Sequence, residues 1–112
     1  RYSPSDAMRR SLTLAALCLA LAGSAIALGQ SARVEQGGKA FIDSGCYGCH
    51  MVGKLGTSIG PDLTRVGAKY PREYLERWLR DPLLQRPTAH MPKLELTEDQ
   101  VRALAAYLSS LQ

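Results

Sequence analysis

The sequence is poor in the residues that usually build a small core or a structural metal site. It has one tryptophan, one phenylalanine and five tyrosines in 112 residues, and a domain of this size with so few aromatic side chains would be marginally stable. A structural zinc site needs four ligands, and beyond Cys46, Cys49 and His50 the chain has only Cys18, inside an apolar run, and His90. No stretch shows strand periodicity, which argues against a thioredoxin-like βαβ unit and predicts an all-α fold.

The most informative stretch is Cys46-Tyr47-Gly48-Cys49-His50. Two cysteines separated by two residues and followed at once by histidine form the attachment pattern of a c-type haem. Each thiol can add across one vinyl group, which gives two thioether bonds on one edge of the macrocycle. The histidine then lies under the iron, where an imidazole nitrogen can bind it. We therefore interpret Cys46 and Cys49 as attachment residues and His50 as an axial ligand.

A buried haem would also supply the apolar volume that the aromatic residues do not provide. Because covalent haem attachment occurs on the oxidising side of membranes, the motif predicts a domain on the periplasmic side. The net charge gives no sign of a nucleic-acid partner. Residues 33–112 carry 11 basic and 9 acidic side chains, and two haem propionates would bring this part of the chain close to neutral.

An apolar segment precedes the motif. Residues 11–29 contain no charged side chain, and the run from Leu12 to Leu28 has 17 residues, about 25 Å as a helix and near the shortest span of a bilayer. Ala25-Ile26-Ala27 also fits the cleavage site of a signal peptide, which would leave a soluble periplasmic protein. We favour a transmembrane anchor, with Arg9 and Arg10 on the cytoplasmic side.

These features divide the chain into a polar segment at residues 1–10, the anchor at 11–29, a linker at 30–35 and a haem-binding domain at 36–112. Two loops of the domain should contact the haem, one after the attachment motif and one at residues 83–96. The first, rich in glycine, contains Pro61, whose carbonyl we expect to accept the second ring N–H of the axial histidine and so fix its tautomer.

Three helices are predicted in the domain. The first spans residues 35–42 and ends at Ser44-Gly45, with Gly45 as its stop. The second runs from Pro71 to Arg80. The last runs from about Glu98 to Leu111, after a capping box that begins at Thr97. Its inner face is marked by Val101, Leu104, Ala105, Leu108 and Leu111, beside Tyr107. Trp78, on the second helix, is interpreted as packing in the core or at the haem edge rather than as an electron relay.

The second axial position has three candidates. Met51 is adjacent to His50 and cannot easily reach the opposite face of the haem. We favour Met91, because a loop 41 residues after His50, with one helix folded in, can return from the far side, and Pro92 stiffens it. His90 would instead give two histidine ligands, and an open position remains a further alternative.

At this point residues 34–112 resemble a class I c-type cytochrome domain. The resemblance rests on Cys-Tyr-Gly-Cys-His, Gly-Pro-Asp-Leu at residues 60–63, the Met-Pro loop and the Ala-Tyr-Leu of the last helix. It implies a helical domain around one haem, with the first and last helices crossing at a contact made by Gly37, Phe41 and Tyr107. Residues 75–82 and the following loop also resemble cytochrome domains attached to terminal oxidase subunits.

With both axial positions filled, the iron has no open site for substrate, so the pattern predicts an electron carrier rather than an enzyme. We expect a membrane-anchored protein with one haem that passes single electrons between redox proteins. It would act as a tethered shuttle or as a subunit of a respiratory or photosynthetic complex. The alternatives are a soluble periplasmic carrier, a haem domain with an open sixth position for catalysis or gas sensing, and a structural subunit with a vestigial haem.

Overall fold

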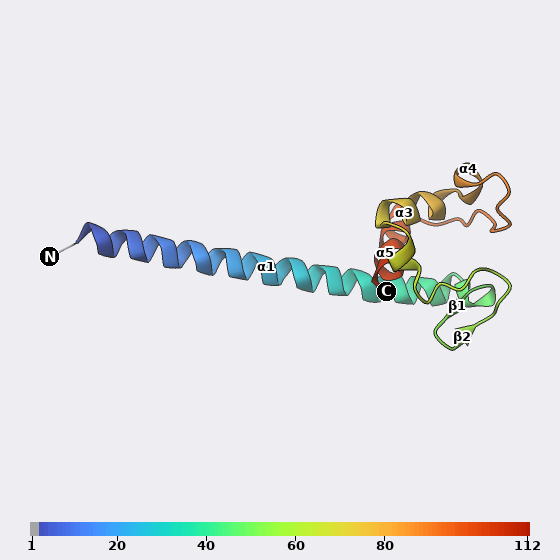
Figure 1. Ribbon diagram of the computed structural model, residues 1–112, viewed down its shortest axis with the longest axis horizontal. Coiled ribbons are helices and arrows are strands. Elements are labelled where there is room, and N and C mark those ends of the chain that lie inside the picture. Colours follow the sequence, from blue (N-terminus) through green and yellow to red (C-terminus); the bar gives the residue numbers. More distant parts are fainter. Residues whose placement is uncertain (1–2) are drawn as a thin grey trace. The chain divides into compact units, whose positions relative to one another are not determined.

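The computed structural model describes residues 3–112 and has two compact units, Arg1–Ser31 and Ala32–Gln112. Figure 1 labels most of the elements. In chain order they are α1 (Pro4–Asp43), η1 (Cys46–Gly48), β1 (Met51–Val52), β2 (Leu55–Gly56), α2 (Val66–Lys69), α3 (Arg72–Arg80), α4 (Pro82–Gln85) and α5 (Glu98–Ser110).

The first unit is the N-terminal part of α1. By length and composition this helix could cross a membrane. Its side chains are exposed from Met8 to Ala32, although most of them are apolar. The hydroxyls of Ser11, Ser24 and Ser31 donate to the carbonyls four residues earlier. These three hydroxyls therefore have their hydrogen-bond partners within the helix itself.

The linker that the sequence predicts at residues 30–35 is helical. It contains neither proline nor glycine, so nothing interrupts the hydrogen bonds that begin in the apolar segment. The α1 helix continues to Asp43, and Gly45 follows at φ 73°. This left-handed conformation suits glycine and ends the helix where the sequence predicts.

In the second unit, α1 and α5 meet at a contact without room for a side chain. A Cβ on Gly37 would clash with the carbonyl oxygen of Ala103 and with the Cβ of Tyr107. Phe41, one turn later, is 2% exposed, and its ring lies 5.4 Å from the ring of Tyr107. The helix crossing expected from the glycine and the two aromatic residues is confirmed.

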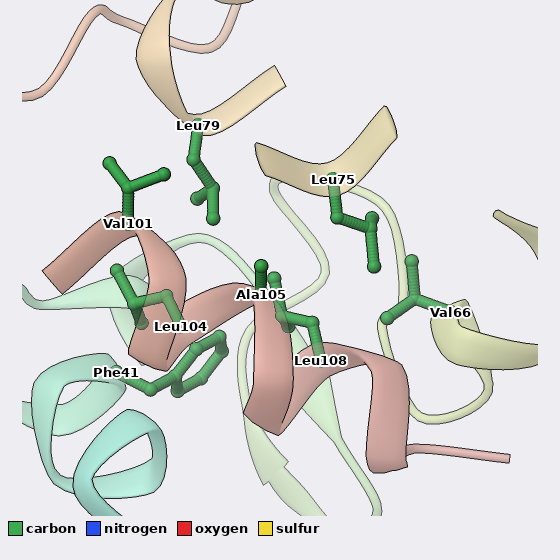
Figure 2. Packing of buried hydrophobic residues seen from close by; sticks show 8 residues of the cluster. All are labelled: Phe41, Val66, Leu75, Leu79, Val101, Leu104, Ala105 and Leu108. Atoms are coloured by element: carbon green, nitrogen blue, oxygen red, sulfur yellow. The ribbon is translucent and has the colours of Figure 1, made fainter. Parts of the chain in front are cut away.

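The core of the second unit gathers around α5 (Figure 2). Leu75 and Leu79 of α3 and Val66 of α2 pack against it. The sequence predicts most of the buried face of α5, which consists of Val101, Ala103, Leu104, Ala105, Ala106 and Leu108. Leu111, expected on the same face, is partly exposed because the helix ends one residue earlier. Three of these six residues are alanines, so half of the buried side chains of α5 are small.

Four short elements, the two strands and the helices α2 and α4, are absent from the expectations. Met51–Val52 pairs antiparallel with Leu55–Gly56, and strands of two residues are too short to show alternation. The four-residue helix α4 falls largely in the loop expected at residues 83–96, and α2 lies before the second predicted helix, where the sequence predicts no element. Asp81 begins α4 by accepting from the N–H of Leu84. The fold remains predominantly helical, as predicted.

Candidate haem-binding site

A cavity of about 510 Å³ lies within the second unit. This volume is in the range of cofactor sites. Its apolar wall comes from α2, α3, α5 and the end of α1, through Phe41, Val66, Leu75, Leu79, Leu104 and Leu108. Cys46, Cys49 and His50 line the same cavity, so the attachment motif faces a large apolar space.

The motif forms one tight turn. The N–H groups of Cys49 and His50 both donate to the carbonyl of Cys46, at 3.2 and 2.9 Å. Burial raises the pKa of the Cys46 thiol, whereas Cys49 is exposed. The hydroxyl of Thr57 donates to the carbonyl of Gly48 at 2.8 Å and ties the following loop to the turn. Both thiols and the imidazole are therefore presented from one short, fixed segment.

The His50 ring is oriented by the loop that follows it. Its Nδ1 lies 2.7 Å from the carbonyl oxygen of Pro61. A carbonyl only accepts, so Nδ1 carries the proton and Nε2 keeps a free lone pair for a metal. Gly60 leaves space for this arrangement, since a Cβ there would lie 2.8 Å from the Cε1 of His50.

The loop around Pro61 is stiffened by Asp62 and Thr64. The Asp62 carboxylate accepts from the hydroxyl of Thr64 at 2.6 Å and from its N–H at 2.8 Å. These hydrogen bonds, the hydroxyl's first, hold the pKa of Asp62 below its ordinary value. The Thr64 hydroxyl also accepts from the N–H of Gly53, in the hairpin. The sequence alone does not predict this network, because an aspartate two residues before a threonine is common in loops and does not indicate a particular site.

Met91 and Trp78 meet at the same cavity. The Nε1–H of Trp78 donates to the Sδ of Met91 at 3.1 Å, and both side chains are half-buried. His90 also lines the cavity but is exposed, whereas Met51 is not among the lining residues. Of the three candidates for the second axial position, the structure thus places Met91 and His90 at the cavity.

Aromatic side chains four residues apart cover one wall. The rings of Tyr70 and Tyr74 stack at 4.8 Å, and those of Tyr74 and Trp78 lie 6.2 Å apart. All three line the cavity. The sequence analysis singles out Trp78 alone, although the spacing at positions 70, 74 and 78 could have revealed the set.

These residues suit a haem c. Two thiols, an imidazole with its Nε2 free and a thioether face a space whose walls are mainly apolar. Lys69 and Arg86 also line it, and their positive charges suit the two carboxylates of a haem. A soft thioether and an imidazole are both ligands that haem iron accepts.

Comparison with known proteins agrees with this site. Residues 34–112 match the sequence model of the family described as Cytochrome c. The chain belongs to the cytochrome c family, and its haem c is bound covalently through Cys46 and Cys49.

Two curated relatives are named "Cytochrome c oxidase subunit 2". The protein from Alkalihalophilus pseudofirmus is 39% identical over 101 residues, which cover 75% of this chain and 30% of the relative. The protein from Bacillus sp. (strain PS3) is 33% identical over 94 residues, which cover 70% and 26%. The match therefore spans less than a third of each relative's length.

The space that Gly60 leaves beside the His50 ring can be tested by substitution. The variant Gly60→Ala should press on the imidazole ring, destabilise the haem-loaded protein by about 1–3 kcal/mol and broaden its visible spectrum. Gly48→Ala is the matched control, because a Cβ there meets no atom within 4 Å. Thermal unfolding and absorbance measure both effects. Equal behaviour of the two variants would show that the space beside His50 is unimportant.

Proposed function

We propose that this protein is a membrane-anchored electron carrier with one haem, in which His50 and Met91 are the axial ligands. The haem supplies a one-electron change between ferric and ferrous iron. The observation that carries the proposal is that His50, with its Nε2 free, and Met91 line one apolar cavity together with both attachment cysteines. Both axial positions would then be filled from the chain itself, which favours electron transfer over substrate chemistry.

The residues around the cavity favour the ferrous state. Apolar walls disfavour the extra positive charge of ferric iron, and a thioether is a weak, neutral ligand. The N–H of Trp78 draws electron density from the Met91 sulfur through their hydrogen bond, which weakens sulfur donation further. Lys69 and Arg86 add positive charge at the cavity. Together these features support a high reduction potential.

We propose that α1 anchors the haem domain to the membrane. Its apolar segment, residues 11–29, is long enough to span a bilayer with Arg9 and Arg10 on the cytoplasmic side. The haem domain would then lie on the periplasmic side, where covalent attachment takes place. The two relatives named as oxidase subunits support a membrane-bound respiratory complex as the redox partner.

Replacement of Met91 tests the axial assignment. In Met91→His the iron should stay six-coordinate while its potential falls by on the order of 0.1 V, within the ~0.8 V range that axial ligands cover. In Met91→Ala the position should open and the ferrous protein should bind carbon monoxide. His90→Ala is the neighbouring control and should change neither property.

Carbon monoxide binding also separates the alternatives. If the reduced wild type binds carbon monoxide as readily as Met91→Ala, the sixth position is open, and catalysis or gas sensing replaces electron transfer. If His90→Ala, and not Met91→Ala, opens the iron, the second ligand is His90.

The anchor is tested by removing it. The full chain should require detergent for extraction from membranes, whereas a chain that begins at Ala32 should be soluble and keep the same haem spectrum. This result is expected because residues 32–112 form a compact unit with its own core. A membrane-free protein whose mature N-terminus lies near Leu28 would instead identify residues 11–29 as a cleaved signal peptide.

A further inference from the structure

The loop that carries Met91 has almost no backbone restraint. Among the described residues, the N–H groups of residues 90–96 donate no hydrogen bond to the protein. The last backbone bond before them is from Ala89 to the carbonyl of Arg86. The order of this segment must therefore come from side chains. At the end of the segment, Leu96 packs against the core. Closer to Met91, the restraints include the hydrogen bond from Trp78 to Met91 and a charged pair.

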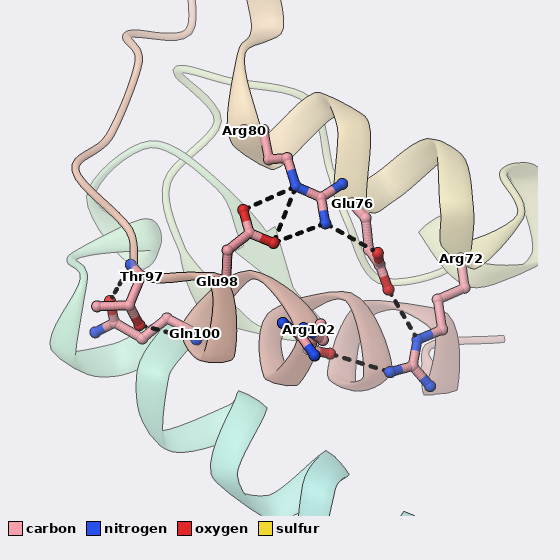
Figure 3. Close-up of polar contacts among 7 residues, drawn as sticks. All are labelled: Arg72, Glu76, Arg80, Thr97, Glu98, Gln100 and Arg102. Carbon is pink, nitrogen blue, oxygen red and sulfur yellow. Dashed lines mark hydrogen bonds and ion pairs between the residues drawn. The ribbon is translucent and has the colours of Figure 1, made fainter.

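The first pair joins α3 to α5, across the segment that contains α4 and the loop. Arg80 is the last residue of α3, and Glu98 is the first residue of α5 (Figure 3). The Nε of Arg80 lies 3.0 Å from Oε1 of Glu98, and its Nη2 lies 2.9 Å from Oε2. The same guanidinium contacts Glu76 at 3.3 Å. Two parallel contacts to one carboxylate fix the relative orientation of the two side chains as well as the distance between them.

The second pair lies closer to Met91. The Nζ of Lys93 is 3.5 Å from Oδ2 of Asp81. Asp81 is itself fixed, since it accepts from the N–H of Leu84 and begins α4. The contact therefore joins a residue two positions after Met91 to the start of the short helix on the other side of the loop.

We propose that Arg80, Glu98, Asp81 and Lys93 form a clamp that keeps the loop closed and so determines how firmly Met91 holds the iron. The proposal rests on the axial role proposed for Met91. These are positioning residues, since they act on Met91 through the backbone of its loop. Release of either pair leaves Met91 bound by its own ligation and by the N–H of Trp78.

Ionic strength is the natural probe of the clamp. Exposed pairs are screened by salt, and single ones contribute little. A two-point guanidinium–carboxylate pair with a third charged partner is the geometry in which coupling becomes measurable. An added ligand that competes with Met91 should therefore bind more tightly to this protein as salt is raised.

The experiment titrates imidazole into the ferric, haem-loaded full chain in detergent, at low and at high salt. Variants are Arg80→Gln, Glu98→Gln and the double variant, with Lys93→Gln for the second pair. At low salt each should bind imidazole roughly two- to fivefold more tightly than wild type. The double variant should bind no more tightly than the singles, because one pair is lost in all three. High salt should bring the wild type to the level of the variants.

The exposed pair Lys39–Asp43 on α1 provides the matched control. Lys39→Gln and Asp43→Asn should leave imidazole affinity unchanged at both salt concentrations. The salt dependence of imidazole affinity is measured on the wild type alone. It therefore tests the clamp even if a variant folds poorly.

Two outcomes overturn the inference in different ways. If the wild type excludes imidazole far better than Met91→Ala, but neither salt nor the variants change its affinity, Met91 is a ligand and the clamp is wrong. If the wild type binds imidazole as tightly as Met91→Ala, the axial assignment itself fails, and the clamp fails with it.

Discussion

The apolar cavity that the helices leave open is the feature on which the rest of this structure depends. Its apolar walls come from the inner faces of the core helices, with Leu75 and Leu79 from α3 and Leu104 and Leu108 from α5. Polypeptide alone would leave this surface wet, at a cost that grows with its area. A covalently attached haem covers it. The group that completes the core is thus also the group that carries the electron.

The two sides of the cavity are held in different ways. On the His50 side, a tight turn, a two-stranded hairpin and the bonds of Pro61, Asp62 and Thr64 fix the backbone. On the Met91 side, side chains provide the restraint that backbone hydrogen bonds do not. The His50 ring is therefore oriented by hydrogen bonds of the loop that follows it, whereas the Met91 sulfur accepts from Trp78 in a loop with few backbone hydrogen bonds.

The sequence predicts features that depend on short, strict spacing. The attachment motif, the capping box at Thr97 and Gln100, and the crossing at Gly37 all belong to this group. The hydrogen bond that the sequence led us to expect between His50 and the Pro61 carbonyl is present. The hairpin, α2 and α4 escape prediction because elements of two to four residues carry no periodicity. The pairing of Arg80 with Glu98 joins residues 18 apart, and only the packing of α3 on α5 brings them together.

The central claim is that one sulfur from the chain lies on the iron in both oxidation states. X-ray absorption at the iron edge tests it most directly, on the full chain in its ferric and ferrous forms. The account predicts five nitrogen scatterers and one sulfur scatterer in the first shell of each form. A first shell of six nitrogens, or of five ligands without sulfur, would contradict the assignment of Met91 and remove the main support for an electron carrier.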